Sequence, residues 1–138
     1  MNEIKTNLAS GLKLKRLLFK DLDFTRVESE IDNVELQMKI SKDAELLSDS
    51  DCKVTLKILI YTENKSITIG ATMIGFFEIK DKVDSAFARH IMETNTIAIM
   101  FPYLRSQISL ITTQPDMSPI IIPALNINKL TKSDDTDL

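Results

Sequence analysis

The chain has 138 residues, of which 43% are hydrophobic and 27% are charged, and it carries a net charge of -3. This size and composition predict a single globular domain, and the lack of a basic stripe argues against nucleic acid as a partner. Cys52 is the only cysteine, which excludes an intrachain disulfide and fits a reducing compartment. No apolar run approaches the ~18–20 residues that a membrane helix needs. Residues 1–10 also lack the apolar core of a secretory signal, so we expect a cytoplasmic protein without direct membrane insertion.

Four stretches alternate apolar and polar residues with the two-residue period of a β-strand. The short connection Glu63–Lys65 predicts that the third and fourth strands are antiparallel neighbours. The four stretches are 12–24, 34–41, 54–61 and 67–79. In the first stretch, the alternation places one set of side chains on a single face: Leu12, Leu14, Leu18, Leu22 and Phe24.

After Lys82 the apolar spacing becomes helical. Asp84 or Ser85 can cap a first helix, and the polar stretch Thr94–Thr96 predicts its end. A second helix is predicted from Ile97, with Pro102 in its first turn or at a kink. Its single apolar seam consists of Ile97, Phe101, Leu104, Ile108 and Ile111.

Strands followed by helices predict an α+β domain, in which two main helices pack on one face of a four-stranded antiparallel sheet. We expect this domain to span residues 1–130. Residues 131–138 are polar and acidic and are predicted to form a short disordered tail.

The second face of the predicted sheet is also apolar. Covering each large apolar side chain stabilises the protein by about 1.5–3 kcal/mol, so we expect a neighbouring subunit, the C-terminal segment or a client polypeptide to cover part of this face. A charged residue in place of Phe76 should then change the oligomeric state or client binding. The assignment depends on strand register, because a one-residue slip inverts the two faces. Besides Phe76, this predicted oligomer or client surface comprises Leu17, Phe19, Leu59, Tyr61 and Ile74.

Catalytic chemistry finds little support in the sequence. His90 is the only histidine, and Cys52 precedes an apolar strand, where a buried thiol is expected. The acidic pair Asp49 and Asp51 lacks the glycine and the distal glutamate of a calcium loop. With three glycines in all, the chain has no phosphate-cradling loop. We therefore expect no catalytic residue, no metal and no cofactor, and a protein that is not an enzyme.

Several short motifs occur in an order that resembles the SecB-like family. The segment Ile97–Arg105 resembles the opening of that family's long helix, where a Phe-Pro-Tyr-x-Arg core is characteristic. Lys20–Phe24 is similar to the Lys-Asp-x-x-Phe of its first strand, and Ile74–Ile79 lies where the family has a strand with glycine and aromatic residues. Pro123–Asn126 is similar to the segment that follows the long helix.

The resemblance implies an ATP-independent chaperone, or holdase, that binds unfolded or extended polypeptides in apolar grooves, for example during protein export. It also implies a homotetramer built as a dimer of dimers. The positions that match the family's client-binding grooves are Val34, Leu36, Met38, Phe76, Phe77, Ile108 and Ile111.

The chain departs from the family where the motor ATPase SecA docks. Asp21 matches one acidic docking position, but Thr25 stands where the family has Glu, and Gly70 falls near another acidic position. These departures put SecA docking in doubt.

Solitary SecB-like proteins include chaperones that guard an antitoxin, so one alternative is a dedicated adaptor for a single partner of that kind. A small-ligand-binding domain on the same fold is a second alternative.

Overall fold

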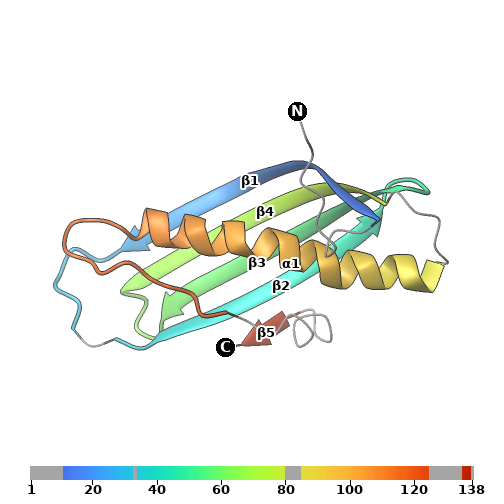
Figure 1. The fold of residues 1–138 in the computed structure, drawn as a ribbon. Coiled ribbons are helices and arrows are strands. Elements are labelled where there is room, and N and C mark those ends of the chain that lie inside the picture. The colour runs from blue at the N-terminus through green and yellow to red at the C-terminus, as the bar shows by residue number, and fades with distance from the viewer. Residues whose placement is uncertain (1–10, 33, 80–84, 125–134, 138) are drawn as a thin grey trace.

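The computed structural model describes residues 11–32, 34–79, 85–124 and 135–137. Its elements are β1 (Leu12–Arg26), β2 (Leu36–Leu46), β3 (Asp51–Thr62), β4 (Ile67–Ile79), α1 (Ser85–Ile111) and β5 (Asp135–Asp137). The strands form one sheet in the order β1-β4-β3-β2-β5, and all neighbours are antiparallel. Figure 1 shows α1 lying across one face of this sheet. The predicted α+β class and the predicted antiparallel sheet are therefore confirmed.

The helical region is one helix in place of the two that were predicted. The expected break at Thr94–Thr96 and the expected new helix start at Ile97 were wrong, because α1 runs without interruption from Ser85 to Ile111. Threonine and asparagine lower helix propensity by less than about 1 kcal/mol each. Thr96 and Ile97 are fully buried, so packing of the helix against the sheet outweighs this small local preference.

Two register shifts in β1, at Lys15 and Lys20, change the face assignment in the middle of that strand. A bulge adds one residue to one strand and inverts the alternation beyond it. Leu17 and Phe19 consequently lie on the helix side of the sheet, opposite Gly75 and Met73 of β4, while Leu18 lies on the other side opposite Ile74. The predicted faces of these three residues were wrong. The second bulge restores the original phase.

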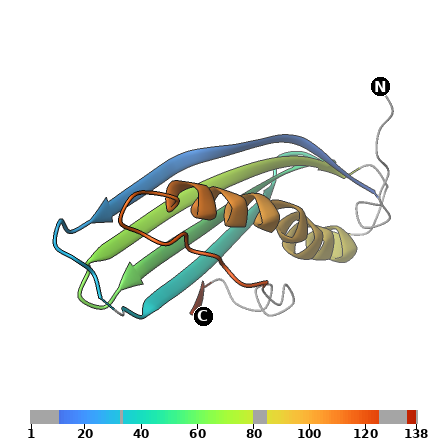
Figure 2. The ribbon, with the colours of Figure 1, turned by 60° about the vertical axis from the view of Figure 1, so that its left-hand side comes forward.

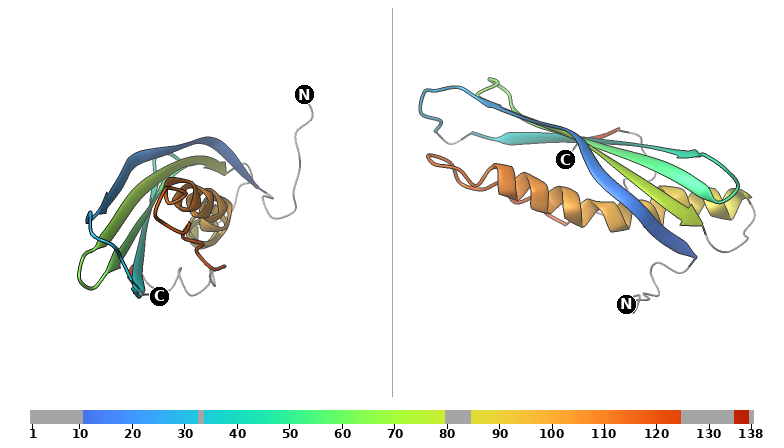
Figure 3. Two further views of the ribbon diagram at one scale, coloured as in Figure 1. Left: turned by 90° about the vertical axis from the view of Figure 1, so that its left-hand side faces the viewer. Right: turned by 90° about the horizontal axis from the view of Figure 1, so that it is seen from above.

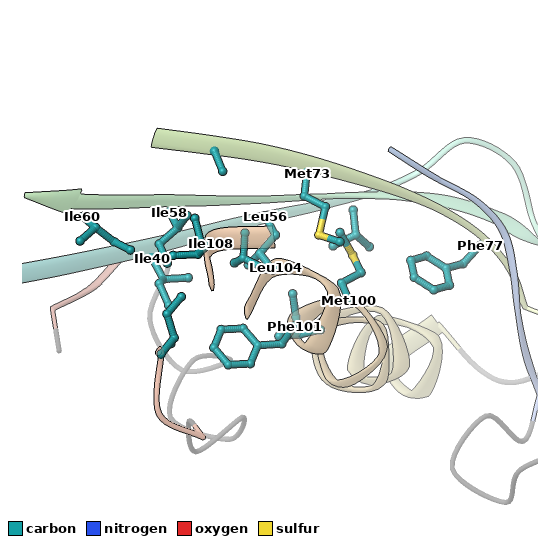
Figure 4. Packing of buried hydrophobic residues seen from close by; sticks show 14 of the residues in the cluster. Ile40, Leu56, Ile58, Ile60, Met73, Phe77, Met100, Phe101, Leu104 and Ile108 are labelled. Carbon is teal, nitrogen blue, oxygen red and sulfur yellow. The ribbon is translucent and has the colours of Figure 1, made fainter. Parts of the chain in front are cut away.

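The protein core lies between α1 and the inner face of the sheet (Figure 4). The predicted seam of α1 is confirmed for its first four residues, which are buried, whereas Ile111 is half-buried. Met100 joins this seam. Gly75 makes room for it, because a Cβ at this position would lie 2.7 Å from the Phe77 ring and 3.0 Å from the Met100 sulfur.

The chain beyond α1 turns back along the helix. Figure 2 shows this return segment, residues 113–124, running along the side of α1 that faces β2. At Asp135–Asp137 the structure differs from the predicted disordered tail, since these residues form β5 and pair with β2. Residues 131–134 and 138 of that tail lie outside the described residues.

Candidate functional site

Arg26, the last residue of β1, joins two segments that flank the end of α1 (Figure 1). Its Nε donates to the carbonyl of Val27 at 2.8 Å, and its Nη2 donates to the carbonyl of Ser29 at 2.9 Å. Its Nη1 donates to the carbonyl of Asp116 at 3.0 Å. One half-buried guanidinium therefore ties the crossover loop, described at residues 27–32 and 34–35, to the turn that begins the return segment.

The return segment is held on α1 by side chains of the helix end. Arg105 Nε donates to the carbonyl of Ile122 at 2.8 Å, and the Ser109 hydroxyl donates to the carbonyl of Ile120 at 2.9 Å. The hydroxyl of Thr112 accepts from the Ile120 amide at 2.8 Å. Side chains at the end of α1 and just beyond it thus hold an extended apolar backbone through its main-chain groups, as a strand neighbour would.

Apolar side chains that keep exposed surface lie on the segments near the end of α1. Most of them are half-buried and pack against the edge of the core, and Leu36 of β2 is 38% exposed. They come from the crossover loop, the start of β2, the end of α1 and the return segment. We call this set the apolar rim: Ile31, Val34, Leu36, Met38, Ile111, Met117 and Ile120.

Four of the predicted groove residues belong to the apolar rim: Val34, Leu36, Met38 and Ile111. The other three predicted groove residues, Phe76, Phe77 and Ile108, do not contribute exposed surface to the apolar rim. Phe77 and Ile108 are fully buried in the core. Phe76 is half-buried on the outer face of the sheet, the face turned away from α1, where the Arg16 guanidinium lies 5.8 Å from its ring centre.

The predicted oligomer or client surface is divided by the bulges of β1. Leu59, Tyr61 and Ile74 lie on the outer face, as predicted, because they alternate with the buried residues of β3 and β4. Leu17 and Phe19 are a correction: they pack against the core on the helix side. Asp21 is exposed on the outer face of β1.

Sequence reasoning missed a groove of about 590 Å³ between α1 and the return segment. Two strongly exposed apolar side chains, Leu110 and Ile121, line it together with the buried Ile122. The signal for Ile121 was present in the sequence: when Ile120 and Ile122 face the protein in an extended segment, the residue between them faces solvent.

The described residues carry little that is typical of a catalytic centre. Burial, together with the neighbouring Asp51 carboxylate, raises the pKa of the Cys52 thiol to about 11, so this buried cysteine is a poor nucleophile. Among the described residues, no three His, Cys, Asp or Glu side chains are placed to hold a metal ion together. The described helix also lacks the combination of length and apolarity required to traverse a bilayer.

The arrangement of one antiparallel sheet and one long helix has a counterpart among solved structures. The structure matches a SecB-like chaperone of Mycobacterium tuberculosis, solved in complex with a peptide from an antitoxin, with a TM-score of 0.69 and 11% identity. The match covers 86% of this chain and 93% of that chain.

The sequence relatives point to the same family. The chain is 26% identical to an uncharacterized protein of Methanocaldococcus jannaschii, and this match covers 85% of the chain and 80% of that protein. It is 25% identical to the protein-export protein SecB of Acinetobacter baylyi, and this match covers 85% of the chain and 82% of that protein. Residues 5–136 match the family model described as preprotein translocase subunit SecB, and the chain belongs to the SecB family.

Proposed function

We propose that this protein is an ATP-independent chaperone of the holdase type, which binds unfolded or extended polypeptide segments at the apolar rim. The observation that carries the proposal is the gathering of incompletely buried apolar side chains at the end of α1. The main-chain groups beside them are held by Arg26, Arg105 and Ser109. The site is therefore apolar and structured, which suits an apolar segment with little sequence selectivity.

Methionines contribute to the low sequence selectivity of the proposed binding site. Met38 and Met117 are both half-buried at the apolar rim. The unbranched thioether side chain adapts to surfaces of different shape, and such residues are frequent where a protein accepts varied partners. We propose that they let the rim accept different apolar side chains.

The second candidate is a dedicated chaperone for one partner, such as an antitoxin. The similarity in fold to a chaperone solved with an antitoxin peptide favours it. Docking to SecA receives less support, because Lys39 and Lys57 lie on the same outer face as Asp21 and make its charge mixed.

The test is suppression of the aggregation of a chemically unfolded protein in the absence of nucleotide. The holdase proposal expects suppression of several unrelated test proteins, with binding in the micromolar range. A single tight partner, with no general suppression, supports the dedicated chaperone. A protein that suppresses nothing, but whose melting temperature rises with a small molecule, would replace both proposals by a ligand-binding role.

A further inference from the structure

β5 covers a short part of the far edge of β2, which is the side of β2 turned away from β3. β2 pairs with β3 along its whole length, from Leu36 to Leu46. At the far edge, β5 pairs with positions 39–41, and no other described segment forms a strand there. The sheet curves around α1 (Figure 3), and β2 is the last long strand at this margin. The N–H and C=O groups of such an edge pair readily with another extended chain.

β5 is a weak strand for covering this edge. It consists of the three residues Asp135–Asp137, whereas strands commonly have about five or six. Aspartate is depleted in strands, and the segment contains no apolar residue whose burial would hold it in place. Its pairing therefore depends on main-chain hydrogen bonds and on charge, so a strand with apolar residues can replace it.

The register of β5 brings opposite charges to neighbouring positions. Asp137 is the register partner of Lys39, and Asp135 is the partner of Ser41. On its other side, Ser41 pairs with Lys57 of β3, and both lysines are exposed. Opposite charges at facing positions of adjacent strands stabilise the pairing. Residues 125–134 also tether β5 to the return segment, and a short tether gives an effective concentration on the order of millimolar.

The part of the edge that β5 covers adjoins the apolar rim. Leu36 and Met38 precede Lys39 in β2 and lie on the side that faces α1, where Met38 packs against the core. An antiparallel segment in the place of β5, continued past the partner of Lys39, comes opposite Met38 and then Leu36. Those two residues of the segment share a face with Met38 and Leu36. Pairing with the far edge of β2 thus brings alternate side chains of the segment onto the rim.

We propose that the far edge of β2 is a strand-addition site for an extended polypeptide with apolar residues at alternate positions, and that β5 occupies this site in the free protein. The incoming segment takes the place of β5, pairs with β2 through main-chain groups and covers Met38 and Leu36. It gains apolar burial that β5 lacks, so the exchange favours it. Until then, β5 protects the edge from unselective pairing. The inference rests on the proposed function, because it adds a main-chain contact to binding at the rim.

The test measures binding of an uncharged peptide with blocked ends, in which serine and valine alternate, to the full chain. Asp137→Lys places a second cation opposite Lys39 and should release β5, and it lies outside the core, so the fold is retained. An edge that is free in roughly one molecule in ten weakens the apparent affinity about tenfold, so Asp137→Lys should bind the peptide up to about tenfold more tightly than the wild type.

Two further variants separate pairing from net charge. Lys39→Asp, added to Asp137→Lys, restores an opposite-charge pair and should return the affinity to the wild-type value. Asp23→Lys makes the same charge change at an exposed position of β1 and should leave the affinity unaltered. The peptide with every backbone nitrogen methylated keeps the valine side chains but has no N–H donors, and it should bind none of these proteins.

Amide exchange reports the edge without a client. Exchange at positions 39–41 should be faster in Asp137→Lys than in the wild type, and should slow again when the unmodified peptide is added. Equal affinities of the wild type and Asp137→Lys for the peptide, including no binding by either, would overturn the proposal. Equally tight binding of the methylated peptide would overturn strand addition. Suppression of aggregation that persists in either case leaves the holdase proposal standing, whereas its absence in the wild type and in Asp137→Lys removes that proposal separately.

Discussion

Arg26 and Asp116 are 90 residues apart in the sequence, yet the Arg26 Nη1 donates to the Asp116 carbonyl at 3.0 Å. The Arg26 Nη2 also lies 3.5 Å from the Asp116 carboxylate. Asp116 has a positive φ of 61°, a left-handed conformation that aspartate and asparagine adopt more readily than most residues. This pair fixes the turn after α1 against the end of β1, and with it the place where the apolar rim forms.

Replacing Arg26 with methionine should loosen both segments that it joins. Hydrogen bonds from a charged donor contribute about 1.5–3 kcal/mol, and we expect the free energy of unfolding to fall by roughly that amount. Amide exchange in residues 113–124 should accelerate more than exchange in β3. Lys20→Met removes an exposed cation from the same strand and serves as the control. Unchanged exchange in the return segment would contradict the role assigned to Arg26.

Client binding should depend on Leu36 and not on Leu46. These two leucines lie at opposite ends of β2, on the side that faces α1, and are 38% and 48% exposed. Covering one such side chain contributes about 1.5–3 kcal/mol, so Leu36→Asp should weaken binding of an unfolded protein by roughly 10- to 100-fold. Leu46→Asp, away from the apolar rim, should retain wild-type affinity. Equal losses in the two variants would place the binding surface elsewhere.

Two adjacent isoleucines of the return segment should differ sharply in their effect on stability. Ile122 is 2% exposed and Ile121 is 76% exposed. Ile122→Ala removes buried methyl groups and should lower the free energy of unfolding by about 2–5 kcal/mol. Ile121→Ala should change it by less than about 0.5 kcal/mol. Denaturant unfolding measures both, and similar values would mean that the segment is not docked as described.

Stability should fall in alkaline solution because of Cys52. Burial and the Asp51 carboxylate raise the thiol pKa from 9.0 to about 11, so the folded protein holds this proton more tightly than the unfolded chain does. The resulting stabilisation is complete below pH 9 and is lost as the pH rises from 9.0 through about 11, at up to about 1.4 kcal/mol per pH unit. Cys52→Ala should remove this part of the alkaline loss of stability, while the part that comes from other titrating groups remains. An identical alkaline loss in both proteins would contradict the assignment.

The fold was predictable where neighbouring residues alone decide burial. The alternation in 54–61 and 67–79 predicted β3 and β4, which are buried at every second residue on the helix side. The spacing of Ile97, Phe101, Leu104 and Ile108 predicted the buried seam of α1. Continuity of the helix through Thr94–Thr96 was missed, because contact with the sheet outweighs a weak local preference.

The candidate site was predictable in part. Val34, Leu36 and Met38 were predicted as groove residues because residues 34–41 alternate with a two-residue period, and the structure leaves all three incompletely buried. Phe76 and Phe77 were assigned to one groove, although consecutive residues in a strand face opposite sides. The structure places Phe77 in the core and Phe76 on the outer face.

By itself, the sequence determined the class of fold and most of its core, because side-chain spacing within a strand or helix specifies which residues share a face. Tertiary structure alone decided the remainder. Pairing with β4 revealed the bulges of β1 that turn Leu17 and Phe19 inward. Folding also brought Arg26 to Asp116 and set Asp23, Gly70, Leu59 and Lys39 in one row. These relationships join residues far apart in the chain, so they depend on strand register and chain reversal, which local periodicity does not encode.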